Sequence, residues 1–280
     1  MTRALDPEVI DVVWAAVEPL LPPPDESHPL GCHNPRVPDR VCFRGLVFRL
    51  VTGSSWVDIE AMMDFVVSDT TLRARRDEWI AAGVFDAVYT EAVAAFDRVV
   101  GLDLSEVSID GSTHKAPYGG EGTGKSPVDR GKLGWKWSVA ADRNGVPLGW
   151  DIDGANRHDI KLLGPTLGAV NNAGLIADID TLHLDRGYDY PVIERRLTQL
   201  GVDDHVIAKR RKRGEPPPPR QTLGMRWVVE GTNSWWSNYG QLRRSTDRRN
   251  RHRHAALCLA TAVLIIGRLI DHRNRWNPPI

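Results

Sequence analysis

The feature that most constrains the fold of this 280-residue chain is a change of hydrophobic pattern near Leu104. Before this point apolar residues recur at helical spacing, whereas after it short apolar runs alternate with helical stretches. An Asn-Gly pair at 144–145 indicates a hairpin turn between two of these runs. The expected elements are strands 106–110, 136–142 and 146–151, helix 159–172, strand 181–185, helix 190–200, strand 205–208, and helices 226–239 and 255–270. This pattern predicts an α/β domain over residues 104–280.

The order of these elements matches that of a ribonuclease-H-like fold. Three strands of antiparallel character come first, and helix-strand-helix-strand and further helices follow. In that fold the first and fourth strands lie side by side. We therefore expect the ends of strands 106–110 and 181–185 to meet, which would bring Asp110 next to Asp185.

Residues 1–103 are predicted to form an all-α domain. Asp6-Pro7-Glu8 is typical of a helix start, as is Ser68-Asp69. The pair of helices over residues 54–82 resembles a helix-turn-helix, whose second helix enters the major groove of DNA. A purely structural helical domain is the alternative. The side chains expected to read base edges are Arg73, Arg75 and Arg76.

Charge is distributed unevenly along a chain whose net charge is zero. Residues 205–280 hold 16 Lys and Arg against 4 Asp and Glu. Such a basic segment indicates an anionic partner, of which DNA is the obvious one, although a solvated surface is the alternative. The basic runs 209–213 and 243–253, the second of which starts with Arg243 and Arg244, are expected to neutralise phosphates.

Composition argues against several other classes of protein. The three cysteines are scattered and form no CxxC pair, which disfavours a disulfide framework or a zinc site. The first residues contain no apolar signal segment. The apolar run 255–266 is shorter than the roughly 20 residues of a membrane span, so we expect a buried core helix. A cytoplasmic protein without a membrane partner is predicted.

Three acidic residues stand out because each is flanked by apolar residues: Asp110, Asp185 and Glu230. Solvated surface charge does not explain all three. Carboxylates carried on a core sheet and an adjoining helix can converge on divalent metal ions. Two such ions about 4 Å apart clamp the attacking and leaving oxygens of a phosphodiester. The sequence therefore predicts nuclease or polynucleotidyl-transferase chemistry.

The expected helix over 226–239 has two distinct faces on a 3.6-residue period. The polar face is made of Arg226, Glu230, Asn233, Ser237 and Gln241. The opposite face is made of Trp227, Gly231, Trp235 and Tyr239. We expect the aromatic face to be buried and Glu230 to point to the other side. A simple ion pair between Arg226 and Glu230 is the alternative to a metal-binding role.

Residues 119–126, GGEGTGKS, fit the P-loop pattern GxxxxGK[ST]. That pattern needs a preceding strand and a following helix, and Pro127 follows at once. We therefore expect no nucleotide and instead predict a flexible loop near Asp110. Its basic side chains would hold DNA phosphates: Lys125, Arg130 and Lys132. The segment 156–159 has catalytic residue types, but a helix-capping role is preferred.

Three segments together resemble a bacterial insertion-sequence transposase of the DDE type, in the group named after insertion sequence five. They are GGEGTGKSPVDRGK after VSIDGS, LHLDRGYDY, and RWVVEGTNSWWSNYGQLRRSTDRR. The resemblance covers essentially the whole chain. It implies that Asp110, Asp185 and Glu230 are catalytic residues that bind two metal ions, either Mg²⁺ or Mn²⁺. It also implies that Arg226 matches the arginine of the Tyr-Arg-Glu-Lys signature of the family.

The chain departs from that signature at Leu223, Gly231 and Ser237. These departures concern contacts to DNA strands, for which Arg243 and Arg244 are candidate replacements. The resemblance further implies cleavage at inverted-repeat ends, joining of the freed 3′-hydroxyls to target DNA, a homodimer or higher assembly, and a location at the bacterial nucleoid. Two rival hypotheses are a degenerate, repressor-like DNA-binding protein and a P-loop phosphotransferase.

Overall fold

The computed structural model divides the chain into two compact units. The part that the structure describes comprises residues 4–24, 35–209 and 226–276. The helical unit is assigned Met1–Val99, Asn238–Ser245 and Arg251–Ile280. The sheet unit is assigned Val100–Ser237 and Thr246–Asn250.

The helical unit contains the helices that the sequence predicts together with two short ones, at 18–20 and 240–243, that it does not. They are α1 (Pro7–Val17), the 3-10 helix η1 (Glu18–Leu20), α2 (Asp39–Thr52), α3 (Trp56–Met62), α4 (Asp69–Ala81), α5 (Val84–Val99), α9 (Gly240–Arg243) and α10 (Asn250–Trp276). Two predicted caps are confirmed. The Asp6 side chain accepts a hydrogen bond from the Glu8 N–H at 2.9 Å, and the Ser68 hydroxyl accepts one from the Thr71 N–H at 3.2 Å.

Helix α10 supplies much of the apolar core of the helical unit. All residues from Ala255 to Gly267 are buried, which confirms the predicted core helix and extends it at both ends. The helix is long and apolar enough to cross a membrane by length and composition. However, 78% of its most apolar window is buried inside the protein, as in the core helix of a globular domain.

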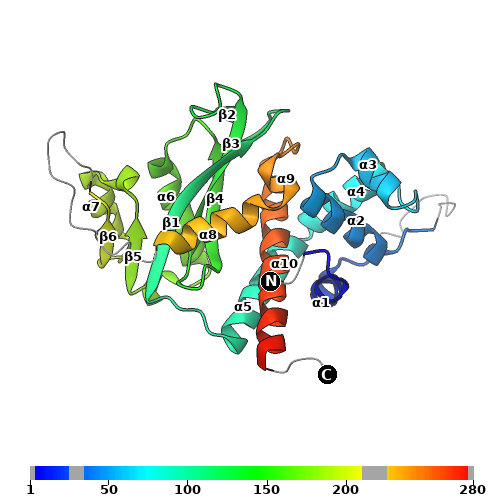
Figure 1. The fold of residues 1–280 in the computed structure, drawn as a ribbon, viewed down its shortest axis with the longest axis horizontal. Helices are drawn as coiled ribbons and strands as arrows, with labels where there is room; N and C mark the ends of the chain where they lie inside the picture. The colour runs from blue at the N-terminus through cyan, green and yellow to red at the C-terminus, as the bar shows by residue number, and fades with distance from the viewer. Residues whose placement is uncertain (1–3, 25–34, 210–225, 277–280) are drawn as a thin grey trace. The chain divides into compact units, whose positions relative to one another are not determined.

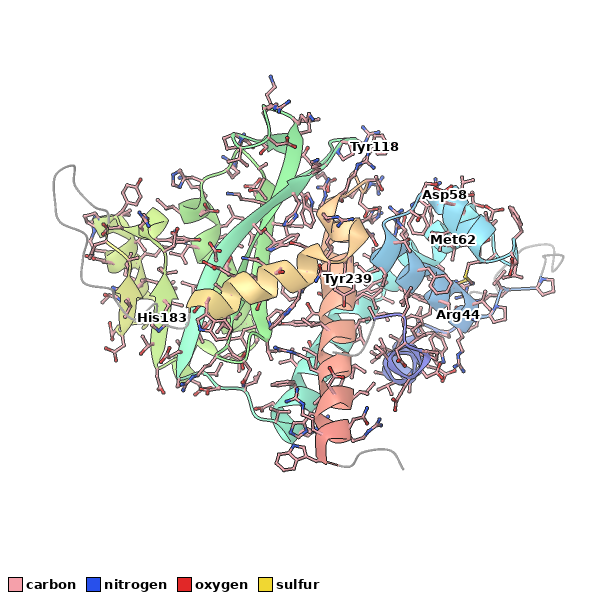
Figure 2. The ribbon with its side chains drawn as sticks, viewed as in Figure 1. Arg44, Asp58, Met62, Tyr118, His183 and Tyr239 are labelled. Atoms are coloured by element: carbon pink, nitrogen blue, oxygen red, sulfur yellow. The ribbon has the colours of Figure 1, made fainter. Side chains whose placement is uncertain are left out.

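The sheet unit alternates strands with helices (Figure 1). Its strands are β1 (Glu106–Lys115), β2 (Gly124–Lys125), β3 (Leu133–Ala141), β4 (Pro147–Gly154), β5 (Thr181–Leu184) and β6 (His205–Ile207). Its helices are α6 (Asp159–Asn172), the 3-10 helices η2 (Ile176–Asp178) and η3 (Arg186–Tyr188), α7 (Pro191–Gln199) and α8 (Arg226–Ser237). Figure 2 shows His183 on β5 and Tyr118 in the loop after β1.

The strand order confirms the predicted ribonuclease-H-like topology. Strand β1 pairs antiparallel with β3 and parallel with β5, while β4 flanks β3 and β6 flanks β5. The first and fourth strands of the predicted series therefore lie side by side. Strand β1 continues five residues past the predicted end at Asp110 because Gly111–Lys115 keep pairing with β3.

The two faces of the sheet are covered differently. Helix α6 packs on β3 and β4, and helix α8 packs on β1 and β3 (Figure 1). The α6 face holds an aliphatic core that includes Ile109, Leu163 and Leu184. Because side chains alternate along a strand, Asp110 belongs to the opposite, α8 face.

The expected domain boundary needs one correction. Residues 238–245 and 251–280 group with the helical unit, not with the sheet that precedes them in the chain. The reason is a close crossing of backbones between α2 and α9. Gly53 ends α2 with a φ of 70°, and a Cβ on Gly240 would lie 2.3 Å from the Thr52 carbonyl oxygen.

We predict that Gly240→Ala destabilises the helical unit by about 1–3 kcal/mol, because a backbone oxygen cannot rotate away from the added methyl group. Gly168→Ala, inside α6, is the matched control. Nothing lies within 4 Å of its added Cβ, and alanine is favoured over glycine in a helix by about 1 kcal/mol. Urea unfolding followed by circular dichroism measures both. An unchanged midpoint for Gly240→Ala would contradict the close crossing.

Candidate active site

The pairing of β1 with β5 places Asp110, in the middle of β1, level with Asp185, which directly follows the last residue of β5. Ile109 is the Cα partner of Leu184, and both side chains are buried in the core on the α6 face. The next residue is an aspartate in each case, Asp110 within β1 and Asp185 on the extended backbone just after β5, and both aspartates are half-buried. Because alternate residues face opposite ways, both carboxylates belong to the α8 face.

Helix α8 is tied to Asp110 by a chain of two hydrogen bonds. The Trp137 indole N–H donates to Asn233 Oδ1 at 2.7 Å, and Asn233 Nδ2 donates to Asp110 Oδ2 at 3.4 Å. Glu230 lies three residues before Asn233, on the adjoining turn of the same helix, and is exposed. The helix therefore carries Glu230 to the neighbourhood of Asp110.

The predicted faces of this helix were right for the buried Tyr239 and the exposed Glu230 but wrong at other positions. Trp227 is 63% exposed, whereas Asn233 is only 8% exposed. The side chains that pack on the sheet are Val228, Val229, Thr232, Asn233 and Trp236. Asn233 can be buried because Trp137 and Asp110 satisfy both ends of its amide, so its polarity did not mark a solvent face.

An aromatic layer supports this part of the sheet. Trp137 stacks on His114 with ring centroids 3.8 Å apart, and it meets Trp135 and Trp236 edge-on at 5.2 and 5.5 Å. Burial lowers the pKa of His114 to about 4, so its imidazole is neutral at pH 7. The layer holds the Trp137 N–H in the direction of Asn233.

On the other face of the sheet, an ion pair with a buried lysine lies behind Asp110. Lys136, 7% exposed, donates to Asp159 Oδ1 at 2.8 Å and to the Arg157 carbonyl at 3.0 Å. A Cβ on Gly111 would lie 2.5 Å from the same Asp159 oxygen, which explains why a glycine follows Asp110. His158 stands at the N-cap of α6, as the helix-capping interpretation of 156–159 expects, although its side chain makes no capping hydrogen bond.

Tyr188 lies among several carboxylates. It is 1% exposed, and its pKa is raised well above the usual range, first by burial and then by the charges of Asp159, Asp110 and Asp185. The phenol is therefore uncharged at any physiological pH. Sequence reasoning missed Tyr188, Asn233 and Lys136. The one available signal was that Asn233 stands three residues after Glu230, one helical turn away.

The donor chemistry of Asp110, Asp185 and Glu230 fits a hard divalent cation such as Mg²⁺ or Mn²⁺. The Gly187 N–H donates to Asp185 Oδ1 at 2.6 Å, which fixes this carboxylate at the start of η3. Within the described part of the chain, these three residues do not form a cluster whose donor atoms all lie within 4.8 Å. Two ions about 4 Å apart need a wider spread of ligands than a single ion does.

The glycine-rich loop has a structural explanation that does not involve a nucleotide. Gly124 and Lys125 form β2, which pairs with β3, and no helix begins after them. The Glu121 N–H donates to the Arg248 carbonyl at 2.8 Å, and a Cβ on Gly120 would lie 2.2 Å from that oxygen. The loop is thus fixed to the 246–250 segment, so the prediction of a flexible loop was wrong. Its exposed basic side chains are Lys125, Arg130 and Lys132.

Two of the three arginines expected to read DNA bases are buried. Arg75 is 5% exposed and forms ion pairs with Asp39 and Glu78. Arg76 is 8% exposed, and its guanidinium lies over the Trp56 ring, 5.0 Å from the centroid. Side chains held in this way cannot reach a base edge, so the base-reading role was wrong for these two.

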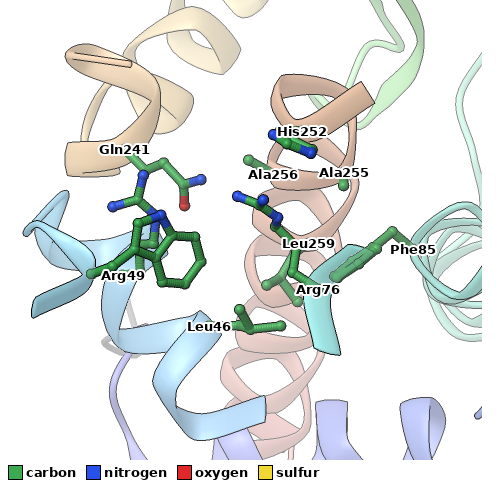
Figure 3. A pocket seen from close by; sticks show the side chains of 10 residues that line it. Leu46, Arg49, Arg76, Phe85, Gln241, His252, Ala255, Ala256 and Leu259 are labelled. Atoms are coloured by element: carbon green, nitrogen blue, oxygen red, sulfur yellow. The ribbon is translucent and has the colours of Figure 1, made fainter. Parts of the chain in front are cut away.

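Arg76 instead lines a pocket inside the helical unit together with Arg49, Gln241 and His252 (Figure 3). This pocket contains none of the three carboxylates discussed above. Arg49 also lies over the Trp56 ring, at 4.2 Å, so one indole carries two guanidinium groups. We interpret this cluster as packing within the helical unit.

The other basic candidates are on the surface. Arg73 keeps 46% of its side chain exposed while pairing with Asp69 at 2.5 Å. Arg243 and Arg244, at the end of α9, are exposed. The side chain of Arg226 and the basic residues 210–213 lie outside the described residues.

Comparison with known proteins gives two family matches. Residues 101–265 match the family described as "Transposase DDE domain", and residues 9–89 match the family described as "Putative transposase of IS4/5 family". A Burkholderia cepacia protein, "Putative transposase for insertion sequence element IS402", is 33% identical over 138 residues. That alignment covers 47% of this chain and 63% of the relative, which is less than two thirds of its length.

Two further similarities were found. The "Insertion element IS402 uncharacterized 16.2 kDa protein" of the same organism is 33% identical over 121 residues, which cover 43% of this chain and 82% of that protein. The "Mos1 transposase paired-end complex with left transposon end" aligns at 11% identity over 87% of this chain and 82% of that chain, with a TM-score of 0.26 that is too low to carry an argument. Because the larger family match covers more than half of its residues, the chain belongs to the DDE transposases, in the IS4/5 group.

Proposed function

We propose that this protein cuts DNA at the inverted-repeat ends of its insertion sequence and joins the freed 3′-hydroxyls to target DNA. The observation that carries the proposal is the register of β1 with β5, which puts Asp110 beside Asp185. The hydrogen bond from Asn233 to Asp110 adds the helix that bears Glu230. This arrangement supports a carboxylate site on the α8 face of the sheet.

In the proposed mechanism, Asp110, Asp185 and Glu230 hold two Mg²⁺ or Mn²⁺ ions. When bound, such ions activate an attacking oxygen and stabilise the leaving oxygen of a phosphodiester. The residues of the chain orient the ligands: Asn233 holds Asp110, and the Gly187 N–H holds Asp185. The same three carboxylates would hold the metal ions in both reactions. The attacking group is water in the first reaction and the DNA 3′-hydroxyl in the second.

DNA binding is proposed to use exposed cations on both units. On the sheet unit they are Lys125, Arg130 and Lys132, and on the helical unit they are Arg73, Arg243 and Arg244. Arg226 is added by resemblance to the family signature. Pairing of two element ends requires at least a homodimer. A nucleoid-associated location follows from this activity.

We predict that Asp110→Asn, Asp185→Asn and Glu230→Gln each abolish metal-dependent cleavage of terminal-repeat DNA while DNA binding survives. Ligands of one site give non-additive losses, so a double variant should be no worse than a single one. Asp153→Asn is the control, because this β4 carboxylate pairs with Arg157 at the surface. Near-normal cutting by one of the three variants would remove that residue from the site. Binding without cleavage by the wild-type chain would favour the repressor-like alternative.

Asn233→Ala is expected to raise the Mg²⁺ concentration for half-maximal cleavage by roughly 10–100-fold, the usual effect of losing a group that orients a metal ligand. It should also cost about 1–3 kcal/mol of stability, because the Trp137 N–H loses its acceptor. Ser234→Ala changes an exposed neighbour on the same helix and should do neither. Measuring the cleavage rate as a function of Mg²⁺ concentration tests the expected shift in the metal requirement. A fall in stability without a shift in the Mg²⁺ requirement would reduce Asn233 to a packing residue.

Arginines of the two units are expected to contribute differently to DNA binding. Arg243→Ala with Arg244→Ala should weaken binding to specific and random DNA alike and lower the slope of log affinity against log salt by about 0.9 for each phosphate that is no longer neutralised. Arg73→Ala should reduce the preference for element ends. Arg76→Ala should instead lower the melting temperature, because this side chain is buried. Titrations with both DNAs at several salt concentrations test these outcomes, and an unchanged end preference in Arg73→Ala would rule out base reading by α4.

A further inference from the structure

A second group of metal-binding side chains lies in the helical unit. Asp86 is on α5, and His254 and Cys258 are four residues apart on one face of α10. His254 Nε2 is 2.7 Å from Asp86 Oδ1 and 3.5 Å from Cys258 Sγ, and Cys258 Sγ is 3.9 Å from Asp86 Oδ1. One oxygen, one nitrogen and one sulfur therefore surround a common point.

We propose that Asp86, His254 and Cys258 form a zinc-binding site. With Zn–S near 2.3 Å and Zn–N and Zn–O near 2.0–2.1 Å, tetrahedral coordination puts donor atoms about 3.3–3.6 Å apart. Of the three observed separations, 3.5 Å lies in that range, 3.9 Å is about 0.3 Å above it and 2.7 Å is about 0.6 Å below it. Small rotations of the Asp86 and His254 side chains are enough to admit the ion.

The combination of donors selects the metal. A thiolate and an imidazole suit Zn²⁺, whereas Mg²⁺ and Mn²⁺ prefer a site made of oxygen alone. Each unit would thus bind a different kind of metal ion. The carboxylates of the sheet unit would bind hard ions, and the site between α5 and α10 would bind an ion that prefers thiolate. Three protein donors leave a fourth position for water.

Two simpler explanations account for less of the geometry. A Cys-His-Asp catalytic triad needs the acid and the nucleophile on different ring nitrogens, but here both contact Nε2 of His254. A surface ion pair between Asp86 and His254 is worth little, since their side chains are 63% and 41% exposed. It also gives no reason for the buried Cys258 thiol to lie against the same nitrogen.

Zinc binding changes the protonation of its ligands, because a thiolate and a neutral imidazole are the forms that bind the metal. On binding, the thiol proton passes to solvent and the sulfur bonds to zinc as thiolate, while the imidazole exchanges its Nε2 proton through solvent for one on Nδ1, which frees the Nε2 lone pair for the metal.

The proposed role of zinc is to join α5 to α10. The covalent connection between these helices is long, since Asp86 and His254 are 168 residues apart in sequence. A cross-link between such distant segments restricts the unfolded chain and stabilises the helical unit. The site uses residues of the helical unit, whereas the proposed catalytic carboxylates belong to the sheet unit, so its failure and theirs can be told apart.

Cobalt substitution in the full-length protein tests the proposal, because a thiolate bound to Co²⁺ gives an intense near-ultraviolet charge-transfer band that carboxylates do not give. The wild-type chain should show this band and lose it on addition of one equivalent of Zn²⁺. Cys258→Ser should lack the band, whereas Cys42→Ser, at another buried cysteine of the same unit, should keep it. Asp110→Asn should also keep it. Absence of the band in the wild-type protein, or its persistence in Cys258→Ser, would overturn the proposal.

Asp86→Asn provides a second test that leaves the core unchanged, because the Asp86 side chain is mostly exposed. Loss of a direct ligand should weaken Zn²⁺ affinity, measured by competition with a chelator, by at least roughly tenfold. Zn²⁺ should raise the melting temperature of the wild-type protein more than that of this variant. Equal affinity, or an equal shift in melting temperature, would exclude Asp86 and with it the three-residue site.

Discussion

The parallel pairing of β1 with β5 is the constraint on which the candidate active site depends. Side chains alternate along a strand, so a slip of one residue would send either Asp110 or Asp185 to the aliphatic face. The register is held by that face, where Ile109 and Leu184 are both buried in the same core. Hydrophobic packing under the sheet thus fixes the positions of charged groups above it.

Two buried polar side chains near this register are each tied to partners on both sides. Asn233 joins the Trp137 indole to Asp110, and Lys136 joins Asp159 to the backbone behind the site. A buried polar network is costly when one member is missing, because the remaining groups stay desolvated without a partner. This explains how a helix that bears an exposed glutamate can be held in a single position against the sheet.

Much of the fold follows from the sequence because local signals agreed with one another. The strand-helix order, the helix caps at Asp6 and Ser68 and the proximity of Asp110 to Asp185 were predictable in this way. The errors arose where a polar residue was taken to mark a solvent face. Leu72, Arg75, Arg76 and Trp79 share one face of α4 at helical spacing, so the burial of both arginines was visible in the periodicity.

Other features depend on contacts that no local pattern contains. The glycines of the 119–126 segment fit a phosphate-binding motif by sequence, yet Gly120 is required by the approach of Arg248, more than a hundred residues away. Similarly, nothing in the spacing of the cysteines suggested that Cys258 would meet Asp86. A scattered cysteine count disfavours zinc only when the ligands are assumed to be close in sequence.

The helical unit is assembled from both ends of the chain, and this has a consequence for how the protein folds. Most of the sheet unit, Val100–Ser237, is continuous in sequence, so its core needs few contacts from outside that stretch. Helices α1 to α5 are made first, but their apolar faces pack in a unit whose core includes α10. Contacts between such distant segments carry a large loop-closure entropy and form late. The helical unit is therefore expected to be completed after the sheet unit, and a cross-link between α5 and α10 acts at the step with the highest entropic cost.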